Sequence, residues 1–170
     1  MHFVDPPKVA LIRGVSGVGN LPLSIAERQK TAAEHALTSA GLAVSIETIS
    51  VTSSGPGAFI FLRPEGENCL AGFSSIGERG KRAEKVGGKA AGALLEYGAT
   101  QACLDPHLVD QIVLYLAMVP GESVFTTSCI TQHLLTNLWV IEHFLGISYM
   151  VDGKPGEPGR VTISGRGRSL

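Results

Sequence analysis

Hydrophobic and polar positions in the first hundred residues switch between strand-like and helix-like spacing. Four segments have the short apolar runs, the alternation or the β-branched content of strands: residues 8–14, 42–51, 58–63 and 69–76. Two segments have helix-like apolar spacing or composition: residues 24–40 and 83–97. Ser24 and Glu27 predict a capping box at the start of the first helix. The expected order of elements is therefore β-α-β-β-β-α.

The second half of the chain predicts another group of helices and strands. Asp105-Pro106 has the form of a helix start, because aspartate caps a helix and proline fits its first turn. The predicted elements are a helix over residues 106–119, a strand over 122–127, a helix over 131–145, and strands over 147–151 and 160–163. Residues 165–170 are expected to fray. Together the two halves predict an α/β fold of layered α+β type.

Composition narrows the functional classes. Of 170 residues, 44% are hydrophobic and only 17% are charged, which argues against a disordered chain. The formal net charge is -1, so a broad basic surface for nucleic acid is excluded and any such contact must be local. The three cysteines lack CxxC spacing, which is typical of a reducing compartment. Because no apolar run is long enough to span a membrane and no signal peptide is evident, we expect a soluble cytoplasmic protein.

A glycine-rich segment, residues 14–20, separates the first predicted strand from the first helix, which is where phosphate-binding loops occur. The Walker pattern continues with lysine and then serine or threonine, whereas Asn20-Leu21-Pro22 stands here. The dinucleotide pattern places its glycines at the opening of the helix, and this helix begins only after Pro22. We therefore predict a plain loop that connects strand to helix.

The histidines and cysteines are too scattered along the sequence to predict a metal site, which needs convergent ligands. His107 and Asp110 lie three residues apart at a helix start, a spacing that can coordinate a metal. A solvated first turn with a favourably placed acid is the commoner explanation of such a pair. We predict no metal ligands among the residues of this chain.

The helix over residues 131–145 carries the most informative polar pair. His133 and Asn137 lie one turn apart, away from the apolar stripe of that helix. The positive end of a helix dipole favours a neutral imidazole, whose lone pair is available for nucleophilic attack. Two interpretations stay open on the residues alone: His133 is a nucleophile, or it is a capping or hydrogen-bonded core residue.

Several segments, in order along residues 8–164, resemble the C-terminal half of the RNA 3'-terminal phosphate cyclases. The similar segments are LPLSIAER at 21–28, GERG at 77–80, AEKV at 83–86, HLVDQ at 107–111, HLLTN at 133–137 and VIEHFL at 140–145. The HLLTN block and the Asp110-Gln111 pair are the most specific of these motifs.

The resemblance implies an ATP-dependent enzyme that converts an RNA 3'-phosphate into a 2',3'-cyclic phosphate, releasing AMP and pyrophosphate. It implies that His133 is the catalytic nucleophile, which carries AMP through a phosphoramidate bond. It implies a nucleotide pocket that includes Asp110 and Gln111, with His107 beside them. ATP and a divalent metal, Mg or Mn, are the implied cofactors, because a metal offsets triphosphate charge.

The same resemblance implies two domains: residues 1–101 match the insert domain of the family, and residues 102–170 match the last repeat of its main domain, a partial sheet with two helices. The N-terminal half of the family is absent from this sequence, so we expect a truncated product or fragment with partly exposed apolar faces. The expected partners are RNA 3'-phosphate ends and the missing N-terminal half, with a possible homo-oligomer. We expect no association with a membrane. The alternatives are a non-catalytic cyclase-like factor in ribosomal RNA maturation and an inactive structural fragment.

Overall fold

Residues 8–67 and 72–99 fold around one sheet, and residues 1–7, 68–71 and 100 onward fold around another. We call the second group unit 1 and the first group unit 2. The computed structural model describes residues 1–165, so the tail that was expected to fray lies outside the described residues, except for Gly165. The predicted domain boundary after residue 101 assigns residues 1–7 and 68–71 to the first domain, whereas both segments belong to unit 1. The domain assignment itself stays a prediction.

Unit 2 has the predicted order β-α-β-β-β-α. Its elements are β2 (Lys8–Gly19), α1 (Leu23–Ser39), β3 (Val44–Val51), β4 (Gly57–Glu67), β5 (Phe73–Ile76) and α2 (Ala83–Thr100). The strands lie in the order β3-β2-β4-β5, with β2 parallel to β3 and antiparallel to β4. A parallel pair needs a crossover connection, and α1 supplies it. The predicted element order is confirmed.

The glycine-rich segment of residues 14–20 is not a loop, and that prediction is wrong. Residues 14–19 continue β2, the strand between β3 and β4. A side chain at Gly14 would lie 2.6 Å from Leu62 Cδ2, one at Gly19 would lie 2.6 Å from Ser53 Cβ, and one at Gly17 would overlap the Phe59 ring. These glycines therefore serve the close approach of neighbouring side chains to the strand rather than a turn.

The helices of unit 2 approach the sheet and each other closely. Ser16 Oγ on β2 lies 2.9 Å from both the Ala26 carbonyl oxygen and Gln29 Oε1 of α1. On α2, a Cβ at Gly87 would overlap the main-chain carbonyl of Gln29, so α1 and α2 meet backbone to backbone at this position. The predicted capping box at Ser24 is wrong: Pro22 occupies the N-cap position of α1, and no side chain in the described part of the chain caps the helix.

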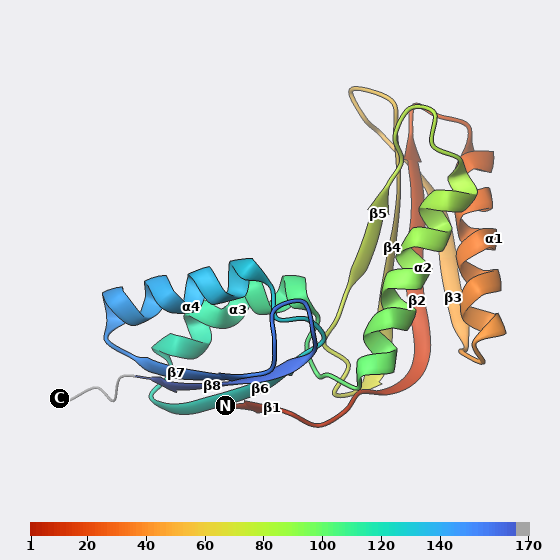
Figure 1. Ribbon diagram of the computed structural model, residues 1–170. Coiled ribbons are helices and arrows are strands. Elements are labelled where there is room, and N and C mark those ends of the chain that lie inside the picture. Colours follow the sequence, from red (N-terminus) through yellow and green to blue (C-terminus); the bar gives the residue numbers. More distant parts are fainter. Residues whose placement is uncertain (166–170) are drawn as a thin grey trace. The chain divides into compact units, whose positions relative to one another are not determined.

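Unit 1 contains a second four-stranded sheet with two helices on one of its faces (Figure 1). Its elements are β1 (His2–Phe3), α3 (Pro106–Met118), β6 (Gly121–Thr127), α4 (Gln132–Leu145), β7 (Ser148–Asp152) and β8 (Gly159–Gly165), and the strand order is β1-β6-β8-β7. Every element was predicted to within two residues at each end, except β1, which is only two residues long. The fold is mixed α/β, as predicted.

The core of unit 1 lies between α3, α4 and the sheet. Val109 and Val113 of α3, Leu138 of α4, and Phe125 and Val161 of the sheet are all buried in one cluster. Phe125 and Val161 are direct cross-strand partners of β6 and β8, so the two strands present one apolar row to the helices. Within the described residues, no helix combines the length and the apolar content that crossing a bilayer requires.

The contact between α1 and α2 makes a prediction about two adjacent glycines of α2. Gly87→Ala should lower the free energy of unfolding by about 1–3 kcal/mol, because the added methyl group overlaps Gln29 and forces the helices apart. Gly88→Ala should raise it by up to about 1 kcal/mol, because nothing lies near that position and alanine favours the helix. Urea unfolding followed by circular dichroism measures both changes. Equal stabilisation by the two substitutions would show that α1 and α2 do not meet at Gly87.

Candidate functional site

The predicted site residues lie on the two helices of unit 1. His107, Asp110 and Gln111 belong to the first half of α3, and His133 to the first turn of α4. His107, Gln111 and His133 are exposed, whereas Asp110 is half-buried. The two helices pack against each other over the same face of the sheet, so the residues share one helix pair (Figure 1).

The start of α4 is capped by Thr131. Thr131 has extended backbone angles, and its Oγ1 accepts a hydrogen bond of 2.9 Å from the main-chain N–H of Leu134. His133 is the second residue of the helix and its side chain is exposed. His133 is therefore neither the cap of this helix nor a residue of the core, and its role as a nucleophile stays a prediction.

Thr131 also links the two helices. Its hydroxyl donates a hydrogen bond of 3.1 Å to Asp110 Oδ1 on α3. Further along α4, one turn after His133, Asn137 Nδ2 donates to the main-chain oxygen of Asp110 at 3.5 Å. Asp110 thus bonds to one residue that precedes His133, Thr131, and to one that follows it, Asn137. The structure brings Asp110 next to the turn that carries His133, and sequence reasoning missed Thr131 as the residue that makes the connection.

The start of α3 is fixed by its own cap. Asp105 is 2% exposed, and its Oδ1 accepts hydrogen bonds from the main-chain N–H groups of His107, at 2.8 Å, and Leu108, at 3.0 Å. Helical spacing then places His107 and Gln111 one turn apart on the exposed stripe of α3. Within residues 1–165, no three His, Cys, Asp or Glu side chains gather as metal ligands would.

The surface of the helix pair continues from these polar residues into exposed apolar ones. On α3 the exposed stripe goes on to Leu114, Tyr115 and Met118, and on α4 the stripe of His133 goes on to Val140 and Phe144, which is 84% exposed. Large exposed apolar patches mark binding surfaces more often than chance. Neither α3 nor α4 contains a lysine or an arginine, so this surface has little positive charge of its own.

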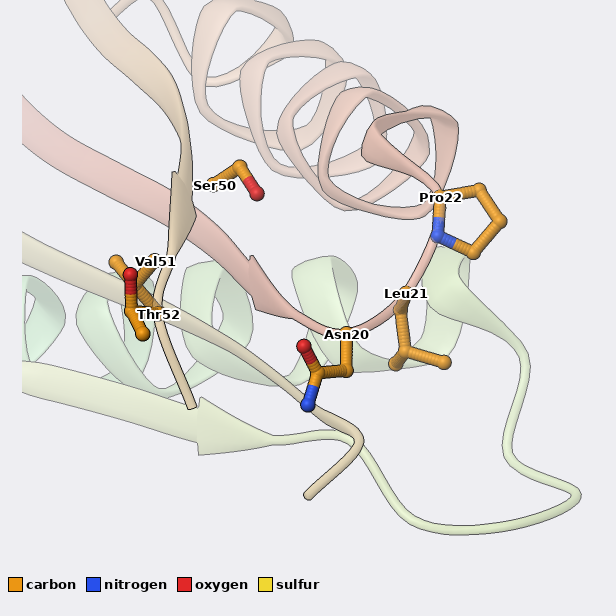
Figure 2. A pocket seen from close by; sticks show the side chains of 6 residues that line it. All are labelled: Asn20, Leu21, Pro22, Ser50, Val51 and Thr52. Atoms are coloured by element: carbon orange, nitrogen blue, oxygen red, sulfur yellow. The ribbon is translucent and has the colours of Figure 1, made fainter. Parts of the chain in front are cut away.

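A separate hollow of about 510 Å³ lies in unit 2, and none of the predicted site residues lines it. It is lined by residues at the ends of β2 and β3 and before α1: Asn20, Leu21, Pro22, Ser50, Val51 and Thr52 (Figure 2). Its side chains carry no charge, although the carboxyl ends of parallel strands are a common place for ligands. The hollow therefore offers no chemistry comparable with that of α3 and α4.

The chain is similar to known proteins over most of its length. Residues 4–99 match the family model described as the insert domain of RNA 3'-terminal phosphate cyclase. The chain is 41% identical over 155 residues to the RNA 3'-terminal phosphate cyclase of Pyrococcus abyssi, a match that covers 91% of this chain and 45% of that protein. It is 44% identical over 133 residues to the cyclase of Methylococcus capsulatus, covering 78% of this chain and 37% of that protein. The chain thus spans less than half the length of these curated relatives.

The double role of Thr131 makes a prediction about helix stability. Thr131→Ala should lower the free energy of unfolding by about 0.5–2 kcal/mol, because it removes the cap of α4 and a hydrogen bond to the half-buried Asp110. Thr131→Ser, which keeps the hydroxyl, should stay close to the parent. Urea unfolding gives the energies, and hydrogen exchange of the α4 peptide localises the change.

Thr136→Ala is the matched control on the same helix. Thr136 is exposed, and among residues 1–165 its hydroxyl bonds only to the Gln132 carbonyl of the preceding turn, so this substitution should change stability by less than about 0.5 kcal/mol. If Thr131→Ala and Thr136→Ala have the same small effect, the cap and the link to Asp110 do not hold the start of α4.

Proposed function

Since the chain belongs to the RNA 3'-terminal phosphate cyclase family, we propose that it supplies the nucleophilic histidine and part of the nucleotide surface of a cyclase. The observation that carries the proposal is the position of His133: exposed, in the first turn of α4, and next to the cap that bonds to Asp110. An exposed ring on a fixed turn can meet a ligand, which a ring in the core cannot.

In the reaction that we propose, an imidazole nitrogen of His133 attacks the α-phosphorus of ATP and pyrophosphate leaves. The new P–N bond holds AMP until an RNA 3'-phosphate takes it over, and the neighbouring 2'-hydroxyl then closes the 2',3'-cyclic phosphate and releases AMP. Imidazole suits this role because it is a good nucleophile whose phosphoramidate is labile enough to pass the adenylyl group on. Thr131 and Asn137 act as positioning residues, since they tie the turn that carries His133 to Asp110.

The predicted site residues of α3 suit the base and sugar of a nucleotide better than its phosphates. His107 and Gln111 offer imidazole and amide groups that both donate and accept hydrogen bonds, and Asp110 offers a carboxylate. The absence of lysine and arginine from α3 and α4 leaves the triphosphate without a counter-charge there. We propose that the triphosphate and a divalent ion, Mg or Mn, meet residues that lie outside α3 and α4.

A further part of the cyclase, corresponding to the length of the relatives that this chain does not span, is the partner that we propose for α3 and α4. Met118, Val140 and Phe144 are exposed further along the same two helices, and a partner that covers them can bring the cations that the triphosphate needs. The substrate class that we propose is RNA with a 3'-phosphate end, because the similar proteins are RNA 3'-terminal phosphate cyclases.

A labelling experiment tests the nucleophile. This chain is joined behind the N-terminal portion of the Pyrococcus abyssi relative, so that the fusion has the full length of a cyclase. Incubated with ATP that is labelled at the α-phosphate, the fusion should acquire one acid-labile AMP, because a phosphoramidate breaks in acid. His133→Ala should reduce the label at least about 1,000-fold, the order expected for losing a nucleophile. His143→Ala, an exposed histidine of the same helix, should label like the parent.

Two outcomes would contradict the proposal. Labelling of His133→Ala at the level of the parent would show that another residue is the nucleophile. A folded fusion that never acquires AMP, but copurifies with precursor ribosomal particles, would instead support a non-catalytic factor in ribosomal RNA maturation. Circular dichroism of each variant establishes that the fusion is folded before the label is compared.

A further inference from the structure

Two segments far apart in the sequence lie side by side in unit 1. Leu70, in the segment that links β4 to β5, forms a parallel bridge with Leu104, in the segment that leads into α3. Leu104 in turn forms a parallel bridge with Thr127 at the end of β6, and its main-chain N–H donates to Thr126 O at 3.1 Å. The two segments therefore extend the pairing of the unit 1 sheet.

This pairing makes neighbours of Cys69 and Cys103. Each cysteine directly precedes a bridge partner, and in a parallel pair residues in register point to the same side of the sheet. Paired strands lie about 4.8 Å apart, which is inside the Cα separation of roughly 4.4–6.8 Å that a disulfide requires. Cys103 Sγ also lies 3.8 Å from the main-chain oxygen of Asn68, against the peptide group that leads into Cys69.

The two thiols differ in access. Cys103 is 2% exposed, whereas Cys69 is half-buried and can meet a small oxidant from solution. Burial raises the pKa of the Cys69 thiol, and burial, with the nearby charge of Asp5, raises the pKa of the Cys103 thiol. Both thiols are therefore mostly protonated at neutral pH, and since the thiolate is the nucleophile, their oxidation is slow there and becomes faster as the pH rises.

We propose that Cys69 and Cys103 are a modification site, at which a peroxide converts the two thiols into an intramolecular disulfide. The Cys69 sulfur attacks one oxygen of the peroxide, the O–O bond breaks, and Cys69 becomes a sulfenic acid while water leaves. The Cys103 sulfur then attacks the Cys69 sulfur, the S–O bond breaks, and a second water leaves. Overall two thiols and one hydrogen peroxide give one disulfide and two waters: both sulfurs are oxidised and the peroxide is reduced.

The disulfide would close a covalent loop that ends just before α3. The loop from Cys69 to Cys103 contains β5 and α2, and Cys103 lies two residues before Asp105, the cap of α3. A disulfide therefore holds the entry to the helix that carries His107 and Asp110. Closing a loop of this length restricts the unfolded chain, so the oxidised protein should melt at a higher temperature than the reduced one.

Peptide mapping of the full chain tests the proposal. Cleavage after glutamate separates the three cysteines onto the peptides 68–78, 97–122 and 123–142. After treatment with hydrogen peroxide, two of the three alkylatable thiols should be lost, and a cross-linked pair of peptides 68–78 and 97–122 should appear with a mass two hydrogens below their sum. Dithiothreitol should restore all three thiols and separate the peptides.

Single variants distinguish this pairing from the alternatives. Cys69→Ser, at the half-buried position, should abolish the cross-link, whereas Cys129→Ser should leave it intact and should still lose two thiols. Cys103 that stays alkylatable after long exposure to peroxide would overturn the proposal. A cross-link that joins peptide 123–142 to either of the others, or to a second chain, would overturn it as well. These results are independent of cyclase activity, because they follow the thiols alone.

Discussion

The hydrogen bond from the Thr131 hydroxyl to the Asp110 carboxylate is the contact on which the candidate site depends. The first turn of any helix has main-chain N–H groups without partners in the helix, and a side-chain cap stabilises that turn. Thr131 caps α4 and, with the same hydroxyl, binds the neighbouring helix. His133 therefore lies on a turn that is held from two sides, and a nucleophile must be held in this way if it is to meet a phosphorus atom repeatedly in one geometry.

The pattern of apolar residues predicted nearly every helix and strand because each pattern is local. It failed at residues 14–19 because glycine is frequent in turns, and the sequence does not show which distant side chains approach these glycines. Gly14 and Gly17 lie under Leu62 and Phe59, side chains that are more than 40 residues away in the sequence. Gly87 in α2 is a similar case: glycine lowers the propensity for a helix, whereas this position admits the main chain of Gln29 of α1. Strand β1 was missed because two residues carry no period.

The candidate site was predictable to a different extent. His133, Asp110 and Gln111 were selected through a resemblance of motifs, and their roles stay predictions. That Asp110 lies beside the start of α4 depends on how two helices pack, which no local pattern contains. The available signal for Thr131 was its position directly before an apolar-periodic helix, where threonine is a preferred cap. The neighbourhood of Cys69 and Cys103 had no signal, because it arises from a bridge between segments 34 residues apart.

The exposure of His133 imposes a further requirement on the reaction that we propose. An adenylyl group on an exposed imidazole is open to attack by water, so a productive cyclase must close this surface while RNA approaches. The helices that carry His133 and Asp110 also expose Met118, Val140 and Phe144, whose burial favours a covering partner by about 25 cal/mol for each Å² removed from water. The same covering partner would exclude water and would bring the cations that α3 and α4 lack. In this scheme, the burial of the apolar surface and the assembly of the phosphate site therefore occur in the same binding step. The burial supplies free energy for binding, and the bound partner supplies the cations for the triphosphate.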